Sequence, residues 1–570
     1  MNVYGCGPST ETTSAGVRTG YCVNSWLVVF AALALCWCGT AAGTPVITTD
    51  LGLVQGTQQG DLVVYKGLPF AAPPVGNLRW RAPQPAKPWP GIKALDQFSP
   101  RCMQKRMYPE NAPAEPMSED CLYLNLWVPP HSTAEKLPVM VWIYGGSLDG
   151  GSGSTPLYAG DVLAKCGVIV VTLNYRLGVF GFLAHPALAS ESATHTTGNY
   201  GLLDQLAALR WVQRNIAAFG GDPSRVTVFG QSSGSISISA LSASPLAKGL
   251  FRYAIGESGG LFEPMNLSPN LTEQGAEKDG LAFAARAGAS SIQTLRGIPA
   301  QTLIKMPFTP GIIIDGSVID EPPIDAFRQG RITPSAFMIG SNQNEGAIFL
   351  VDKKVTPGTF DKLLGDDFPP WLIKLAAPSP GNTSVTAYAA AEKFEGDVRF
   401  HWDMWAWARM ASRAGKPVYL YRFNHPTPCS PREGCADATR HGDEMPYVFG
   451  HDLKHTWTPK DLDLSQLMVR CWTRFAKTGS PNGCGLPDWP SYAAQSAMMV
   501  IGDHPHIVPL RPSNTMDHLD RIYRWVNTMA AHPGITIAIA LVIVCAGIWI
   551  LVLLVRTLLQ RLRRRKVHPV

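Results

Sequence analysis

Little in this chain of 570 residues points to binding of a metal, a nucleotide or a nucleic acid. It has neither the H-E-x-x-H pattern of a zinc helix nor the G-x-x-x-x-G-K-[ST] loop that cradles phosphates. No cysteine cluster has the spacing of zinc ligands. We therefore expect no cofactor and no metal. Low-complexity tracts and internal repeats are also missing, so an ordinary globular enzyme or binding domain is the starting point.

The formal net charge of +6 does not indicate an anionic partner, because it comes from one end of the chain. Six cations lie there without an acid: Arg556, Arg561, Arg563, Arg564, Arg565 and Lys566. Subtracting these six from +6 leaves the remainder formally neutral. Nucleic acid is therefore not expected as a partner.

Both ends carry membrane or export signals. The apolar run 26–35 is too short to span a bilayer and is typical of a signal-peptide core. Ala41 and Gly43 are placed as a cleavage pair, which predicts a leader over 1–43 and a mature start at Thr44. Because Arg18 is the only basic residue in this leader, an uncleaved signal anchor is the alternative.

The range 534–555 is an unbroken apolar stretch without a charged residue. Its length suits a helix that crosses a hydrocarbon core, and the basic tail 556–570 marks the cytoplasmic side. A short linker, 526–533, precedes it. The sequence thus predicts a single-pass type I membrane protein whose main domain lies outside the cytoplasm.

The cysteines fit an exported protein. Of the twelve, four lie in the leader and Cys545 lies in the predicted membrane span. The natural short-loop disulfides are Cys102–Cys121, Cys429–Cys435 and Cys471–Cys484. Cys166 is left over beside an apolar run and is expected to be a buried free thiol.

Two segments match the G-x-S-x-G pattern of a nucleophile elbow, one around Ser232 and one around Ser258. The β-branched run 225–229 predicts a buried strand directly before Ser232. Two prolines soon after Ser258 leave little room for the helix that an elbow needs. Local context thus favours Ser232, although the alternation of 235–239 is more typical of a strand than of a helix.

Short apolar runs alternate with helical stretches from 44 to 525. Buried parallel strands are expected at 139–144 and 168–175, and a helix at 202–218 that stops at a Gly-Gly-Asp-Pro turn. A weaker strand signal at 336–339 precedes the polar loop 340–346. No linker divides this range, so we expect one α/β domain over 44–525.

Five motifs in order give the range 46–525 a family resemblance. They are YKGLPFA at 65–71, RWRAP at 79–83, SEDCLYLN at 118–125, GNYGLLDQ at 198–205 and FGGDP at 219–223. With these motifs the chain resembles the type-B carboxylesterase/cholinesterase family of α/β-hydrolases. The resemblance implies a central, mostly parallel sheet wrapped by helices, with the site at the carboxyl ends of the strands.

The same resemblance implies a catalytic triad. Ser232 would be the nucleophile, Glu345 the acid in the loop 340–346, and His441 the base in the segment HGDEMPYVFG at 441–450. The order Ser, acid, His is the one that α/β-hydrolases use. An ester of a small molecule is then the expected substrate, cleaved through an acyl-enzyme.

The expected oxyanion hole combines the loop Gly145-Gly146-Ser147 with the amide of Ser233. Ser147 stands where the family usually has glycine, and Gln231 stands where it has glutamate. The loop between Cys102 and Cys121 also lacks the tryptophan with which cholinesterases hold a quaternary ammonium. Neutral rather than choline esters are therefore expected.

Three further residues are expected to support the site: Gln231 beside the nucleophile, Ser258 as a hydrogen-bond partner of the acid, and Glu444 in the histidine segment. A neuroligin-type adhesion protein shares the fold and a C-terminal membrane helix and is the alternative. The complete triad favours the enzyme. Glycosylation sequons begin at Asn266, Asn270 and Asn382, and no oligomeric state is predicted.

Overall fold

The computed structural model describes residues 44–105, 116–131, 135–262, 271–426, 438–452, 456–531 and 533–565. Within these residues the main sheet has eleven strands in the order β16-β15-β14-β13-β12-β11-β9-β10-β8-β4-β3. The strands from β10 to β15 along this order pair in parallel, and both ends of the sheet are antiparallel.

The strands of this sheet are β3 (Thr57–Gln59), β4 (Leu62–Pro69), β8 (Tyr123–Val128), β9 (Leu137–Ile143), β10 (Ile169–Leu173), β11 (Gly221–Gln231), β12 (Tyr253–Glu257), β13 (Ala336–Asn342), β14 (Val418–Phe423), β15 (Ala497–Ile501) and β16 (His506–Pro509). Every residue of β9, β10, β12 and β13 is buried. Parallel strands covered on both faces require such continuous apolar runs. The expected strands at 139–144, 168–175 and 336–339 are confirmed, the last extended to Asn342.

The helices that position the site are α4 (Tyr200–Asn215), α5 (Ser233–Ala243), α12 (Ser384–Gly396), α13 (Trp402–Arg413), α14 (Met445–Phe449), α15 (Pro459–Thr478) and α16 (Asn514–Ala531). The short helix η7 (Glu345–Leu350) and the π-helical turn η8 (Asp397–His401) complete the set. The helix expected at 202–218 is present as α4 and a 3₁₀ turn, and it ends at Gly220 in the left-handed conformation.

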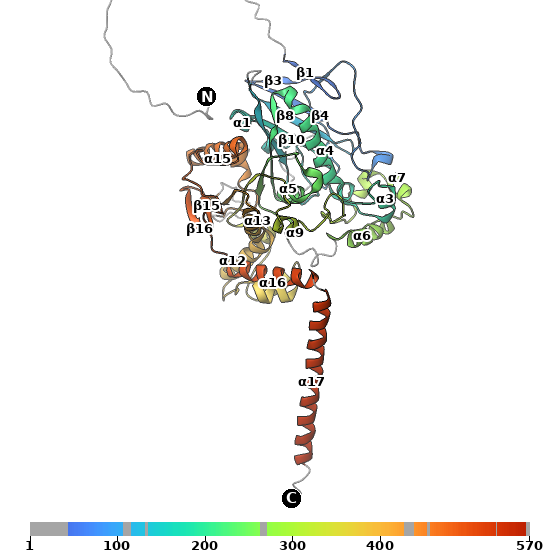
Figure 1. Ribbon diagram of the computed structural model, residues 1–570, viewed down its shortest axis with the longest axis vertical. Helices are drawn as coiled ribbons and strands as arrows, with labels where there is room; N and C mark the ends of the chain where they lie inside the picture. The colour runs from blue at the N-terminus through green and yellow to red at the C-terminus, as the bar shows by residue number, and fades with distance from the viewer. Residues whose placement is uncertain are drawn as a thin grey trace, which may run out of the picture.

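Neighbouring residues of β12 show that helices cover both faces of the sheet. A Cβ on Gly256 would meet the rings of Trp407 in α13 and the hydroxyl of Ser235 in α5. The next residue, Glu257, accepts a hydrogen bond from Trp472 in α15, 2.7 Å away. Because successive side chains of a strand point to opposite faces, α5 and α13 lie on one face and α15 lies on the other. The structure is therefore a three-layer α/β fold (Figure 1).

The chain ends in helix α17, Pro533–Arg565, which follows α16 and extends away from the sheet (Figure 1). No helix among the described residues combines the length and the apolar composition needed to cross a bilayer. The membrane span predicted at 534–555 is therefore not confirmed. The predicted leader 1–43 lies outside the described residues.

Two of the three expected disulfides are present, Cys102–Cys121 and Cys471–Cys484. The third, Cys429–Cys435, lies outside the described residues. The expectation of a free thiol at Cys166 is wrong, because this cysteine is disulfide-bonded. Pairing the cysteines by short loops had left Cys166 without a partner.

Candidate active site

Ser232 occupies a sharp turn between strand β11 and helix α5. Its backbone has φ 55° and ψ −126°, a conformation that L-residues rarely adopt. The turn is held on both sides, because the Ser232 N–H donates to Glu257 O at 2.8 Å and Ile236 N–H donates to Ser232 O at 2.9 Å. Strained backbone that is fixed by its neighbours is typical of functional positions. The side chain is only partly buried.

The two glycines of the G-x-S-x-G pattern are required by close packing against the end of β9. A Cβ on Gly234 would lie 2.0 Å from the carbonyl oxygen of Ile143, and one on Gly230 would lie 2.5 Å from the same oxygen. No side chain fits at either position without moving the sheet. The pattern thus encodes the approach of α5 to the strand, in addition to the turn itself.

His441 is held by Glu345 through a short hydrogen bond. Its Nδ1 lies 2.6 Å from Glu345 Oε2, and its ring stacks on Phe400 with the centroids 4.4 Å apart. The second ring nitrogen, Nε2, lies 3.1 Å from the side-chain nitrogen of Gln231. If the Gln231 amide donates, Nε2 is the unprotonated nitrogen, and Nδ1–H donates to Glu345. This tautomer is the one that a general base requires.

The structure does not join Ser232 to His441 directly. Among the described residues, none forms a hydrogen bond with the Ser232 hydroxyl, and the Gln231 amide occupies the Nε2 position instead. In unliganded enzymes such hydrogen bonds are often long and tighten only when substrate binds. Gln231 was expected beside the nucleophile, but its contact with the histidine was not.

Glu345 is fully buried where η7 begins, just beyond the carboxyl end of β13. Its Oε1 accepts hydrogen bonds from the Ser258 hydroxyl at 2.5 Å and from Asn342 N–H at 2.6 Å. Burial alone would raise the pKa of Glu345. The charge of His441 and the hydrogen bond to it outweigh this effect, with help from the charge of His401 and the hydrogen bond from Ser258, so the pKa of Glu345 is lowered. The acid is therefore ionised at neutral pH.

The pKa of His441 is shifted in the opposite direction. Burial works to lower it, but the charge of Glu345 and the hydrogen bond to it, with smaller contributions from Glu444 and Asp443, raise the pKa of His441 above its ordinary value. An imidazolium at this position is thus stabilised by its carboxylate partner. This is the charge distribution needed when a base accepts a proton during a reaction.

Two further buried carboxyls, those of Glu444 and Glu257, lie near the His441–Glu345 pair. Burial and the nearby charge of Glu345 raise the pKa of Glu444 to about 8, so this side chain is largely protonated at neutral pH. Asn342 Nδ2 donates to it. Glu257, which sequence reasoning missed, has a pKa raised well above its usual range by burial and by Glu444. Its only signal was its place directly before Ser258.

His401 is a second residue that the sequence did not indicate. Its Nε2 lies 3.0 Å from Asn342 O, and its Nδ1 lies 3.0 Å from Asp397 Oδ1. Asn342 is the residue whose N–H donates to Glu345, so His401 and Glu345 are connected through the backbone of Asn342. The spacing of Asp397 and His401 by four residues was a weak signal, since such pairs are common on helix surfaces.

Three backbone N–H groups lie in the region expected to stabilise an oxyanion. Gly146 has φ 113° and Ser147 has φ 56°, so Ser147 does adopt the left-handed conformation that its side chain disfavours. The N–H groups of Gly146, Ser147 and Ser233 donate to no residue that the structure describes. Unpaired donors of this kind are available to a ligand.

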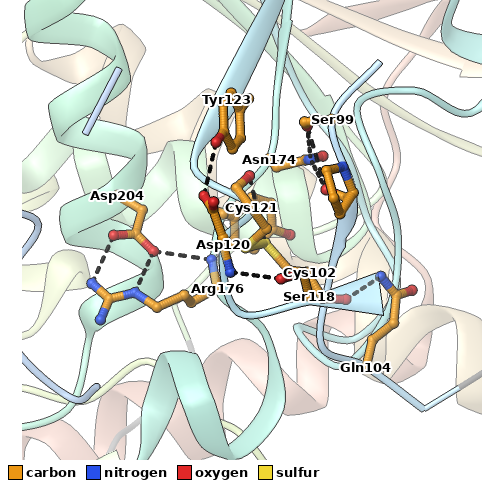
Figure 2. Close-up of a disulfide and its surroundings, with 12 residues drawn as sticks. Ser99, Cys102, Gln104, Ser118, Asp120, Cys121, Tyr123, Asn174, Arg176 and Asp204 are labelled. Atoms are coloured by element: carbon orange, nitrogen blue, oxygen red, sulfur yellow. Dashed lines mark hydrogen bonds and ion pairs between the residues drawn. A yellow bond between two sulfur atoms is a disulfide. The ribbon is translucent and has the colours of Figure 1, made fainter. Parts of the chain in front are cut away.

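The disulfide Cys102–Cys121 helps to hold this loop in place (Figure 2). Gln104 follows the first cysteine, and its side-chain amide donates to Cys102 O at 3.0 Å and to Gly151 O at 2.8 Å. Gly151 N–H donates back to Gln104 Oε1 at 2.9 Å. These bonds tie the far end of the glycine loop to the covalent crosslink.

A buried ion pair lies beside the disulfide (Figure 2). Arg176 binds both carboxylate oxygens of Asp204, at 2.7 Å and 2.8 Å, with both side chains almost inaccessible to solvent. A second pair joins Arg79 to Glu119. Arg79, Glu119 and Asp204 each lie in a motif that carries the family resemblance, at 79–83, 118–125 and 198–205. These motifs thus contribute to ion pairs that are largely shielded from solvent.

Comparison with known proteins supports these observations. A sequence profile described as "Carboxylesterase family" matches residues 43–518. The chain is 37% identical over 518 residues to a fumonisin B1 esterase of Sphingopyxis macrogoltabida, covering 87% of this chain and 93% of that protein. It is 35% identical over 533 residues to carboxylesterase 1C of Rattus norvegicus, covering 84% and 94% respectively.

Among solved structures, a PNB esterase superposes with a TM-score of 0.71 at 34% sequence identity. The match covers 83% of this chain and 99% of that structure. The cocaine esterase of Homo sapiens is also similar, at 34% identity over 527 residues, covering 82% and 90% of the two chains. The sequence is thus shared with all of these relatives, and the fold is shared with the PNB esterase.

Proposed function

This chain belongs to the carboxylesterase family of α/β-hydrolases and is a serine carboxylic-ester hydrolase, and we propose that Ser232, His441 and Glu345 form its catalytic triad. The observation that carries the proposal is the buried His441–Glu345 pair, 2.6 Å apart, beside a strained serine turn. Three described serines have a positive φ: Ser147, Ser232 and Ser258. Ser147 lies in the loop after β9 and Ser258 is fully buried, so of the three only Ser232 is a partly exposed residue between a strand and a helix.

The reaction begins when the Ser232 hydroxyl attacks the ester carbonyl and His441 Nε2 takes its proton. In the free protein the Gln231 amide faces this nitrogen at 3.1 Å, so the Ser232 hydroxyl must replace it. The proton then passes from His441 to the departing alcohol, which leaves an acyl-enzyme. Water, activated by the same nitrogen, releases the carboxylic acid and restores Ser232.

Negative charge on the carbonyl oxygen would be stabilised by the unpaired N–H groups of Gly146, Ser147 and Ser233. Loss of one such donor costs about 3 kcal/mol of transition-state stabilisation in known cases. Ser147 can donate because its side chain does not prevent the left-handed backbone that aims the N–H. The departure from glycine therefore leaves the oxyanion hole complete.

Neutral esters are the proposed substrate class. Gln231 places an uncharged amide next to His441, where the family usually has a carboxylate, so no fixed negative charge attracts a cationic leaving group at this position. The isosteric change Gln231→Glu tests this. It should raise the ratio of kcat/KM for butyrylcholine over ethyl butyrate several-fold, whereas an unchanged ratio would contradict the proposed cause.

We also propose that the domain is exported and membrane-tethered. The support is the apolar stretch 26–35 near the N-terminus, the uncharged stretch 534–555 followed by arginines, the two described disulfides and the exposed sequon residue Asn382. Disulfides persist in oxidising compartments. Expression with and without 534–570, followed by carbonate extraction of membranes, tests it: release of the full chain by carbonate would contradict the tether.

The catalytic proposal is tested by fluorophosphonate labelling and by turnover of neutral esters graded by acyl length. Wild type should be labelled once and should hydrolyse the series with one preferred chain length. Ser232→Ala should lose both activities while keeping its circular dichroism spectrum. A folded wild type that neither reacts nor turns over any ester would favour the adhesion alternative.

A further inference from the structure

A cavity of about 350 Å³ has Asp397 and His401 among its lining residues. Its walls come from strands β13, β14 and β15, from helices α12, α13 and α16, and from the π-helical turn η8. Ser232, His441 and Glu345 do not line it. The cavity is thus separate from the proposed catalytic site, and its volume is within the range of small-molecule sites.

The most unusual group in its wall is the guanidinium of Arg422, which lies near the end of β14, the third strand from one edge of the sheet. Among the described residues, none accepts a hydrogen bond from this side chain or forms an ion pair with it, and its Nε is buried without a partner. Burial lowers the pKa of Arg422, although the charges of Asp397, Glu345 and Glu392 oppose that effect. The side chain as a whole is half-buried, and a partly desolvated cation without a counter-ion is stabilised when an anion joins it.

The acids of the cavity wall do not fill this role. Asp397 is already bound by His401 at 3.0 Å, by Lys393 at 2.9 Å and by Ser513 at 2.6 Å. Burial raises the pKa of Glu392 to about 7, so its charge is only partial near neutral pH. Arg422, together with the exposed Arg511 at the rim, therefore leaves the cavity with uncompensated positive charge.

The rest of the wall is apolar and adaptable. It includes Met404, Trp405, Leu420, Met498 and Met516. Methionine side chains are flexible and polarisable, and they fit aliphatic chains of varied shape. A cation on one side and such a surface on the other match a ligand with an anionic head and an aliphatic tail.

We propose that this cavity binds a medium-chain aliphatic carboxylate, with its head on Arg422 and its chain against the methionines. Such an acid has the chemical class that ester hydrolysis releases, and this link to the product rests on the proposed function. The binding site itself rests only on the geometry and charge of the cavity.

Octanoate binding to the full chain tests the proposal. The catalytic serine is first blocked with a fluorophosphonate, so that the acid cannot bind there, and octanoate is then titrated by calorimetry. Wild type should bind at one site. Arg422→Met, which removes the charge but keeps an unbranched, flexible side chain, should weaken binding at least tenfold. The matched control Arg413→Met, at an exposed arginine outside the cavity, should not change it.

A second readout covers the case in which Arg422→Met does not fold. Saturable quenching of tryptophan fluorescence by 8-bromooctanoate should be present in wild type and largely lost in Trp405→Phe, because Trp405 lines the cavity. Octanamide, which lacks the charge, should bind at least tenfold more weakly than octanoate.

Absence of octanoate binding, equal binding by Arg422→Met, or equal quenching in Trp405→Phe would overturn the proposal. Failure of the proposed catalytic function is distinguishable, because the fluorophosphonate would then not react at all. If only the present inference is wrong, the fluorophosphonate still labels the catalytic serine, and octanoate does not bind.

Discussion

Ser232 and Ser258 lie at the ends of adjacent strands and have nearly the same backbone. Their φ angles are 55° and 57°, and both lie inside a G-x-S-x-G pattern. Each N–H donates to the next strand of the sheet at 2.8 Å, Ser232 to Glu257 O and Ser258 to Gly340 O. The pattern thus gives both serines a positive φ and an N–H bonded to the next strand.

Their hydroxyls differ in every respect that matters for chemistry. Ser232 is partly exposed and directly precedes helix α5, and its hydroxyl has no hydrogen-bond partner among the described residues. Ser258 is fully buried, and its hydroxyl donates to Glu345 at 2.5 Å. One serine is available to a substrate, whereas the other is committed to supporting the acid.

The comparison shows that a motif can specify backbone geometry without specifying a role. The turn follows from glycines and close packing, which are local. The role depends on exposure and on the neighbours that the rest of the chain brings to the hydroxyl. Substitutions at the two serines should therefore have unequal effects, although their backbones are equivalent.

The largest difference is expected from Ser232→Ala, which should lower kcat by about 10⁵-fold or more because the nucleophile is lost. The measurement is kcat at saturating neutral ester under conditions that exclude wild-type contamination. A loss smaller than about tenfold would mean that another group attacks the ester and would remove the distinction between the two serines.

Glu345→Gln should lower kcat by about 10⁴-fold, as loss of the carboxylate does in comparable triads. Glu345 raises the pKa of His441, whereas burial alone would lower it. The base must be unprotonated to act, so kcat/KM falls as pH drops through this pKa. In the variant the acid limb of the pH profile should move to lower pH, and a shift to higher pH would contradict the assignment.

Ser258→Ala should lower kcat only about tenfold. It removes one hydrogen bond to an ionised carboxylate, worth about 1.5–3 kcal/mol, and leaves the Asn342 N–H in place. The check is a comparison of kcat with fluorophosphonate labelling, which should persist. A decrease in kcat as large as that of Ser232→Ala would contradict the proposal that Ser258 only supports Glu345.

The smallest effect is expected on stability. Both serines have a positive φ, and a residue held in such a sparsely populated backbone region costs about 1–3 kcal/mol. Ser232→Gly should therefore raise the free energy of unfolding by about 1 kcal/mol while abolishing activity. Ser258→Gly should lower it, because relief of strain does not offset the lost bond to Glu345. Urea unfolding of both variants measures the difference, and equal shifts would contradict it.

The sequence around Ser232 was sufficient to predict much of the fold and of the candidate site. The strand before Ser232, the glycines around it and the order Ser232, Glu345, His441 are all visible in the chain. The alternation at 235–239 was misleading, because this segment lies in helix α5. There the hydroxyls of Ser237 and Ser242 donate to carbonyls one turn earlier, so buried serines are satisfied within the helix.

Residues that act through long-range contacts could not be identified in this way. Glu257, His401 and Arg422 carry no motif, and their roles arise only when distant strands and helices meet. The disulfide bonding of Cys166 was also missed. Burial and partners decide what an acid, a histidine or a cysteine does, and both are properties of the folded chain.

The most direct test of the account is to map the fluorophosphonate adduct on wild type by tandem mass spectrometry. The two candidate serines lie far enough apart in sequence for their peptides to be separated. We predict that the adduct lies entirely on Ser232 and that Ser258 is unmodified. An adduct on Ser258, or on a serine outside both patterns, would contradict the assignment of the nucleophile.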